Sequence, residues 1–189
     1  MANVFISGIP ASGKSFLARK VSQNTGAFRL DTDSLRKNMR KDPTLEPWVN
    51  FYWSKDEKRY LTETSCQEKW SNLVKQSEAF WPIFLREIKE VIKTHPSVII
   101  EGVNILPHLA ARDLNFTGIF LLGESFEQIF ERNKKNPRWG STEELQRLEA
   151  KTFFNCEREN YKREAERYGF KTFTNSEEAE SELLRLLGK

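Results

Sequence analysis

The sequence is short of the residues that usually bind metal ions or form disulfide frameworks. Its 189 residues include only two cysteines, Cys66 and Cys156, and two histidines, His95 and His108. This set is too small and too scattered for a zinc site, whose cysteine and histidine ligands are closely spaced. Because neither cysteine has a second thiol nearby in the sequence, we expect no disulfide framework, and the cytoplasm is the expected compartment.

Long apolar runs and a strong charge of one sign are also missing. No segment approaches the roughly 20 apolar residues of a membrane span, so we expect no membrane partner. The opening MANVFISGIP has no basic residue before its short apolar run, which argues against a secretory leader. Thirty basic and 27 acidic residues give a formal net charge of +3, too small to indicate nucleic-acid binding by itself.

What the sequence does contain is a regular alternation of short apolar runs and amphipathic stretches. The apolar runs read as five strands, at 3–7, 27–31, 97–102, 116–122 and 169–174. Residues with helical spacing lie between them, including 126–135, 142–167 and 176–187. The alternation predicts an α/β protein, one domain over residues 1–189, with a parallel sheet and helices on both faces. The functional loops of such a sheet lie beyond the carboxyl ends of its strands.

The first apolar run leads into GIPASGKS, residues 8–15, which precede a helical stretch. The two glycines, the lysine and the serine match the phosphate-binding loop pattern at all its specified positions. Glycine allows a backbone that turns successive N–H groups toward an anion, and the following helix adds the positive end of its dipole. Lys14 can reach the terminal phosphates of a nucleotide, and Ser15 can ligate Mg²⁺.

We therefore expect the whole stretch to bind a nucleotide through Gly8, Ile9, Pro10, Ala11, Ser12, Gly13, Lys14, Ser15 and Phe16. The expected nucleotide is ATP. Proteins that read guanine carry an Asn-Lys-x-Asp element, whose nearest counterpart here, NKKN at 133–136, lacks the carboxylate. The alternative is a chance glycine-rich turn, but the strand before the loop and the helix after it argue against this.

The second apolar run ends in two aspartates, Asp31 and Asp33, at the edge where the phosphate-binding loop is expected. A carboxylate in this position can take the proton of an acceptor hydroxyl. The two are two residues apart, so an extended chain would point both the same way. The alternative is that Asp33 merely caps a helix that begins at Ser34. Together with the phosphate-binding loop, these residues favour a functional interpretation.

These motifs resemble the P-loop kinases of small molecules, over residues 3–36 and 97–138. Shikimate and gluconate kinases carry similar D-x-D motifs. Polynucleotide 5′-hydroxyl kinase and the zeta-toxin family have an Asp followed three residues later by Arg, as in Asp33 and Arg36. VIIEGVNILP (98–107) is similar to the E-G-V-x-x-x-P segment of 2-phosphoglycerate kinase-like proteins. The resemblance implies an adenylate-kinase-like P-loop fold with a five-stranded parallel sheet.

Applied position by position, the resemblance implies roles for the residues at this edge of the sheet. Asp33 would orient the acceptor hydroxyl and act as its base, and Asp31 would hold Mg²⁺ through water together with Ser15. Arg36 would contact the acceptor. Glu101 would join the metal or acceptor network, and a carboxylate at the end of a buried apolar run also needs a partner. The alternative for Glu101 is a structural salt bridge.

The stretch 125–141, after the fourth strand, is similar to the lid of these kinases. The resemblance implies that Arg132 and Arg138 stabilise the charge on the transferring phosphoryl group. The alternative is a solvated basic surface. The D-G-[FY]-P-R segment of adenylate kinase does not follow the third strand, which makes nucleoside monophosphates less expected acceptors.

The insert between the second and third strands, 38–92, corresponds to the acceptor-binding subdomain of these kinases. Its aromatic residues are Trp48, Phe51, Tyr52, Trp53, Tyr60, Trp70, Phe80, Trp81 and Phe84. Most are expected to form the core of a helical subdomain, but Trp48, Tyr52 and Trp53 have basic neighbours, and Trp48 and Trp53 are predicted to line an acceptor pocket. Aromatic and basic residues together can also hold single-stranded nucleic acid, the less favoured alternative.

The predicted function is the transfer of the γ-phosphate of ATP to a hydroxyl of a small, anionic molecule. Two alternatives stay open. The first is a polynucleotide-type or toxin-type kinase that acts on a 5′-hydroxyl or a nucleotide sugar. The second is a nucleotide-gated binding protein with slow hydrolysis, which would need no carboxylate to orient a hydroxyl.

Overall fold

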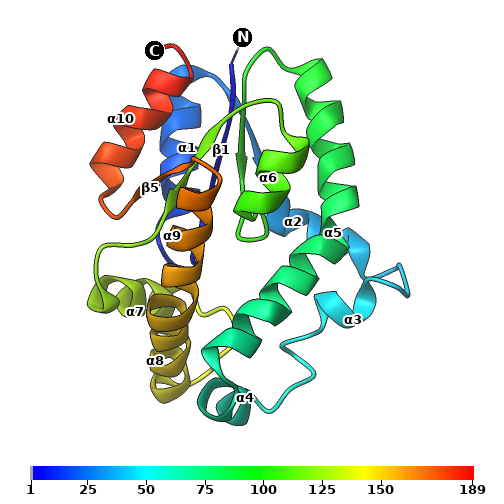
Figure 1. Ribbon diagram of the computed structural model, residues 1–189, viewed down its shortest axis with the longest axis vertical. Helices are drawn as coiled ribbons and strands as arrows, with labels where there is room; N and C mark the ends of the chain where they lie inside the picture. Colours follow the sequence, from blue (N-terminus) through cyan, green and yellow to red (C-terminus); the bar gives the residue numbers. More distant parts are fainter. Residues whose placement is uncertain (1) are drawn as a thin grey trace.

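Five parallel strands form a sheet at the centre of the computed structural model, which describes residues 2–189 (Figure 1). The strands are β1 (Asn3–Gly8), β2 (Phe28–Asp31), β3 (Val98–Glu101), β4 (Gly118–Leu121) and β5 (Lys171–Phe173). Their order across the sheet is β2-β3-β1-β4-β5, and every neighbouring pair is parallel. The predicted α/β class and the predicted five-stranded parallel sheet are confirmed.

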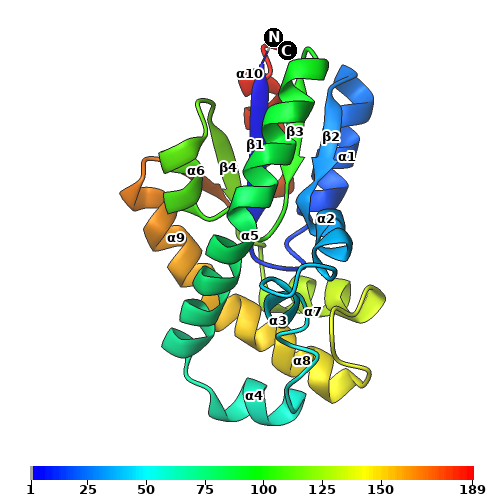
Figure 2. The same ribbon diagram turned by 90° about the vertical axis from the view of Figure 1, so that its right-hand side faces the viewer.

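Helices cover both faces of the sheet, because successive side chains of each strand point to opposite faces. One face carries α1 (Lys14–Thr25) and α10 (Ser176–Leu186), and the other carries α5 (Cys66–Thr94), α6 (Pro107–Asp113) and α9 (Arg158–Arg167) (Figure 2). Within β1, Val4 and Ile6 are buried in the core between the sheet and the helices α1 and α10. Phe5 is buried in the core on the opposite face.

The remaining helices gather beyond the carboxyl ends of the strands, most of them in the lower half of Figure 1. They are α2 (Thr32–Met39), α3 (Glu46–Val49), α4 (Glu57–Glu63), α7 (Phe126–Lys135), α8 (Glu143–Thr152) and the π-helical η1 (Phe153–Glu157). The first half of α5 joins them, and its second half runs back along the sheet. The helix changes direction near its middle, where Pro82 cannot donate a backbone hydrogen bond (Figure 1).

The helical stretch predicted for 142–167 is present as three segments that follow one another without a gap. The segments α8, η1 and α9 run from Glu143 to Arg167. The π-helical segment in the middle was not predicted. Such turns are rare and occur frequently at functional sites.

The two cysteines are bonded to each other, so the prediction of no disulfide is wrong. Cys66 and Cys156 are separated by 90 residues in the sequence, and their Cα atoms lie 4.9 Å apart. Cys66 is the first residue of α5, and Cys156 belongs to η1. Sequence distance misled the prediction because the fold brings these two helices together. The argument from free thiols to a cytoplasmic location therefore no longer holds.

No helix in the part of the chain that the structure describes has the length and apolar character needed to cross a bilayer.

Candidate active site

The phosphate-binding loop takes the backbone conformation for which its glycines are needed. Gly8 and Gly13 have positive φ angles of 124° and 104°. A Cβ atom on Gly8 would lie 2.1 Å from the carbonyl oxygen of Leu121 on the neighbouring strand. Only glycine fits there, so the motif is a steric requirement of the turn as well as a phosphate cradle.

A cavity of about 730 Å³ lies over this loop and the start of α1. It brings together nine of the predicted site residues, Ala11, Gly13, Lys14, Ser15, Phe16, Asp33, Glu101, Arg132 and Arg138. Phe16 is 71% exposed at this cavity, an unusual position for a large apolar side chain. The arrangement gathers phosphate-binding groups and carboxylates around one space.

Lys14 is almost completely buried, and its Nζ donates to the carbonyl oxygen of Ile9 at 2.5 Å. Burial, together with the positive charge of Arg138, lowers the pKa of Lys14 to about 8, while Asp33 acts in the opposite direction. The loop thus holds a lysine whose charge is costly without an anion beside it. The terminal phosphates of a nucleotide would supply that anion.

The two aspartates at the end of β2 have different environments. Asp31 is the N-cap of α2, and its Oδ1 accepts from the backbone N–H groups of Asp33 and Ser34 at 3.0 and 3.3 Å. Asp33 does not cap this helix, contrary to the structural alternative. Asp33 lines the cavity over the phosphate-binding loop, whereas Asp31 is not among its lining residues. Of the two, Asp33 is the one placed to face a reacting group.

Two arginines surround the carboxylate of Asp33. Arg36 donates from Nη2 to Oδ1 at 3.0 Å, and Nη2 of Arg138 lies 3.6 Å from Oδ2. Burial by itself would raise the pKa of Asp33, but Arg36, Arg138 and Lys14 together hold it below its ordinary value. Asp33 is therefore ionised at neutral pH and can accept a hydrogen bond or a proton.

Glu101 at the end of β3 is buried and has a structural partner. Its Oε1 accepts from Nε of Arg29 at 2.5 Å, and the guanidinium also forms an ion pair with it. Glu101 also lines the cavity over the phosphate-binding loop. Glu101 therefore forms the structural salt bridge that was the alternative interpretation. Its role in a metal or acceptor network stays a prediction.

Arg132 of α7 reaches the phosphate-binding loop from the lid side. Its Nη1 donates to the carbonyl oxygen of Ser12 at 2.6 Å, and a Cβ on Gly13 would lie 3.0 Å from the same nitrogen. The arginine therefore lies directly over the loop, where the lid arginine was predicted.

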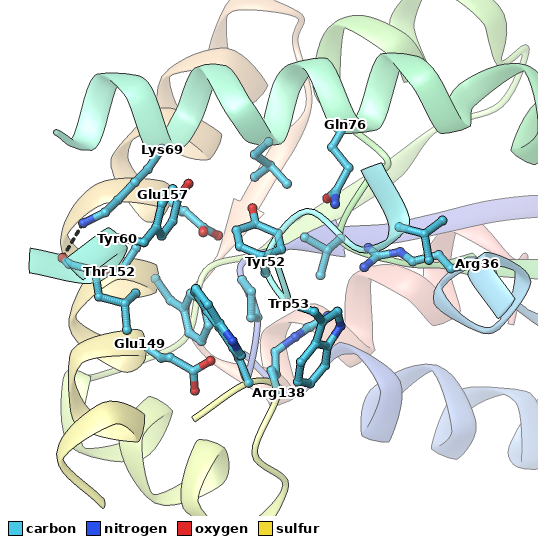
Figure 3. A pocket seen from close by; sticks show the side chains of 17 residues that line it. Arg36, Tyr52, Trp53, Tyr60, Lys69, Gln76, Arg138, Glu149, Thr152 and Glu157 are labelled. Atoms are coloured by element: carbon cyan, nitrogen blue, oxygen red, sulfur yellow. Dashed lines mark hydrogen bonds between the residues drawn. The ribbon is translucent and has the colours of Figure 1, made fainter. Parts of the chain in front are cut away.

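A second cavity, of about 180 Å³, lies between the insert and the helices α8 and η1 (Figure 3). Polar and aromatic side chains from several elements face it, including Arg36, Tyr52, Trp53, Tyr60, Lys69, Gln76, Arg138, Trp139, Glu149 and Glu157. Of the two tryptophans predicted to line an acceptor pocket, only Trp53 does so. Trp48 packs against the core and stacks on Phe51 with their ring centroids 5.6 Å apart.

The two cavities meet at Arg138, which lines both. Asp33 of the first cavity and Arg36 of the second are hydrogen bonded to each other beside it. A group transferred from one cavity to the other would pass this cluster of three charged side chains.

Several lining residues of the second cavity were not found from the sequence: Lys69, Trp139, Glu149 and Glu157. Burial raises the pKa of Glu157 to about 7, in spite of Arg138, Lys14 and Lys69. Glu157 stands in a helical stretch with no motif around it. The only signal was its place beside Phe153, Phe154 and Cys156, in an unusually apolar part of a charged helix.

Solved structures that resemble this chain have the same fold at low sequence identity. TT1252 from Thermus thermophilus is 18% identical with a TM-score of 0.57, over 97% of this chain and 94% of that one. Shikimate kinase from Acinetobacter baumannii, in complex with shikimate, is 12% identical with a TM-score of 0.55, over 98% and 92%. Deoxyadenosine kinase from M. mycoides with bound dATP is 15% identical with a TM-score of 0.54, over 99% and 100%. No curated protein matches.

The sheet, the phosphate-binding loop and these neighbours define a P-loop protein built like the small-molecule kinases, with an adenylate-kinase-like fold. A family model described as AAA domain matches residues 4–101, just over half of the chain. The chain belongs to this family.

Proposed function

We propose that this protein transfers the γ-phosphate of ATP to a hydroxyl group of a small molecule. The position of Asp33 is the observation that carries the proposal. It faces the phosphate cavity, does not cap α2, and contacts two arginines that line the second cavity. A protein that only binds or slowly hydrolyses a nucleotide needs no such carboxylate between two cavities.

In this reaction the acceptor oxygen bonds to the γ-phosphorus, and the bond from that phosphorus to the ADP oxygen breaks. The hydroxyl proton passes to Asp33. Lys14 and Arg132 lie where they can stabilise the charge on the phosphate oxygens, and Arg138 does so at the junction of the cavities. The lid 125–141 thus supplies two of these cations, and the insert 38–92 builds the acceptor side.

The residues over the loop suit a magnesium ion, because Ser15, Asp33 and Glu101 offer oxygen atoms to one cavity. Ser15 would hold the ion together with the nucleotide phosphates. Asp31 would hold it through water with Oδ2, which does not cap α2 and lies 3.6 Å from Nη2 of Arg29. When bound, Mg²⁺ would neutralise part of the charge on the phosphates.

The second cavity supports a small acceptor with negative charge near Asp33. Its volume of about 180 Å³ suits a small molecule better than a polynucleotide. Arg36 and Arg138 line the end of this cavity beside Asp33, where they can bind an anionic group of the acceptor.

The test is transfer of label from γ-labelled ATP to a panel that contains shikimate, deoxyadenosine, simple sugars and an oligonucleotide with a free 5′-hydroxyl. We expect Asp33→Asn to lower acceptor-dependent transfer by roughly 10²–10⁴-fold and to leave ATP affinity within a few-fold. Asp42→Asn, on an exposed turn, is the matched control. Phosphate release without any labelled organic product would reject the kinase proposal in favour of a nucleotide-gated protein.

A further inference from the structure

The π-helical segment η1 places an acidic residue against the acceptor cavity. Glu157 is its last residue, is only 8% exposed, and lines the cavity. In Figure 3 its carboxylate enters from one side of the space, while Arg36 enters from the opposite side. The neighbouring Cys156 is bonded to Cys66 of α5, which fixes the position of this segment.

One oxygen of the Glu157 carboxylate is left unused by the part of the chain that the structure describes. Its Oε2 is buried and has no hydrogen-bond partner among the described residues. The nearby cation Lys69 donates instead to the carbonyl oxygen of Leu61 at 2.7 Å. Burying a carboxylate without a partner destabilises a protein, so an oxygen of this kind indicates a ligand that completes it.

The opposite side of the cavity offers the complementary group. Nε of Arg36 is buried and also lacks a partner, although its Nη2 contacts Asp33 and Asn104. A ligand that spans the cavity would therefore meet an unused N–H donor beside Asp33 and an unused oxygen acceptor at Glu157.

We propose that Glu157 determines acceptor specificity by accepting a hydrogen bond from an N–H or O–H group at the end of the acceptor remote from the phosphorylated hydroxyl. The proposal rests on the proposed function, since it describes the same acceptor. It selects small polar molecules with a donor at the far end, such as amines, amides and polyols. It disfavours molecules whose far end is a carboxylate, because this would lie against Glu157.

The experiment uses pairs of compounds that differ in the remote group. The probes are shikimate and its carboxamide, deoxyadenosine and its N-dimethylated derivative, and a hexose and the matching deoxyhexose. Binding is measured by thermal shift and transfer by γ-labelled ATP, on the wild type, Glu157→Met, Glu157→Gln and the exposed control Glu159→Gln. Glu157→Met keeps the volume and removes both oxygens, and its melting temperature shows whether it folds.

We expect the wild type to prefer the donor-bearing member of at least one pair by about tenfold or more. Glu157→Met should lose that preference through a higher KM for the acceptor, with kcat and the KM for ATP within about twofold. Glu157→Gln, which retains one accepting oxygen, should lie between the two, and Glu159→Gln should behave as the wild type.

The wild-type preference should also weaken as the pH falls through about 7, where the carboxylate of Glu157 takes up a proton. The pH dependence of Glu157→Gln serves as the baseline, because it contains the effects of the other ionisable groups around this carboxylate. These groups are Lys14, Tyr52, Tyr60, Lys69, Arg138, Glu149 and Tyr161.

The experiment distinguishes failure of the inference about Glu157 from failure of the kinase proposal. If label reaches an acceptor and Glu157→Met keeps the wild-type preference, the inference is overturned and the kinase proposal stands. If no pair shows a preference in the binding assay, the inference is overturned whether or not transfer occurs. If a preference in binding depends on Glu157 but no label is transferred, the kinase proposal fails and the binding site for a donor-bearing ligand stands.

Discussion

The two ends of the site are built in opposite ways. The nucleotide end is made by one short segment, residues 8–15, whose backbone conformation and following helix create the anion site. The proposed acceptor end is assembled from side chains of α2, α3, α4, α5, α8, η1 and the loops between them. Phosphate is the same in every nucleotide and can be bound by backbone, whereas an acceptor must be recognised by particular side chains. This difference decides which substitutions affect one end and which affect both.

Among substitutions that act on one end alone, the largest effect is expected from Lys14→Ala at the nucleotide end. The lysine is buried beside the loop, and its charge opposes that of the terminal phosphates. Loss of such a group lowers kcat by roughly 10²–10³-fold. Rates of label transfer and of ATP hydrolysis should both fall, while circular dichroism shows an intact fold. Near-normal turnover in Lys14→Ala would contradict the assignment of this end.

The disulfide tests the acceptor end by itself, because it joins α5 to η1, and neither cysteine belongs to the phosphate-binding loop or α1. In the chain-entropy description, a bond that closes a loop of 90 residues stabilises the fold by about 4.6 kcal/mol. Replacing both Cys66 and Cys156 with alanine should lower the melting temperature by about 10 °C. Dithiothreitol should do the same to the wild type and have no effect on the double variant.

The double cysteine variant should also affect binding at the two ends of the site differently. We expect ATP affinity within a few-fold of the wild type, and weaker binding of any acceptor, because the segment that carries Glu157 is then less constrained. An equal loss of affinity for ATP and for the acceptor would show that the two ends are not independent.

The same contrast explains what could be predicted from the sequence. The sheet and the loop were predictable because apolar runs and a glycine pattern are local signals, and the strands found lie close to 3–7, 27–31 and 97–102. The sequence could not show which aspartate caps α2, since Asp31 and Asp33 are both acceptable N-caps and only the backbone geometry assigns the cap to Asp31.

The acceptor end could not be predicted in the same way. Glu157, Lys69 and Trp139 come from segments far apart in the sequence, and their proximity follows from packing of helices. The cysteine pair was missed for the same reason, although it is the strongest link between two of those helices.

Substitution of Arg138 should affect both ends of the site, because this residue lines both cavities. We expect Arg138→Ala to lower kcat by roughly tenfold to a hundredfold and to raise the acceptor KM, since the arginine contacts Asp33 and is proposed to contact the transferred group. Arg132→Ala, over the loop, should affect kcat and leave the acceptor KM unchanged. Arg163→Ala, on the exposed side of α9, is the control. Identical kinetic profiles for Arg138→Ala and Arg132→Ala would remove Arg138 from the junction.

The smallest effect is the pH dependence of ATP binding, which also sharpens the comparison. Burial, with the charge of Arg138, lowers the pKa of Lys14 to about 8 in the free protein. The phosphates of ATP would raise it again, so binding takes up a proton when the lysine is neutral. ATP affinity should therefore be constant below pH 7 and weaken a few-fold as the pH rises through about 8 to 9. Titration of Lys14 should not make the affinity for the acceptor depend on pH.

Calorimetry at pH 8, in two buffers with different heats of ionisation, should show uptake of about half a proton for each ATP bound. Lys14→Met, which fills the same space without a charge, should abolish the uptake. The stability of the free protein gives an independent check with a fixed sign. The unfolded lysine titrates at about 10.5 and the folded one at about 8, so the unfolded chain binds more protons between these values. This lysine alone therefore makes the wild type more stable as the pH rises through that window, and Lys14→Met should lack the increase. If no proton is taken up on ATP binding and the ATP affinity is unchanged from pH 7 to 9, Lys14 is already paired in the free protein. The charge of Lys14 would then not depend on the phosphates of ATP.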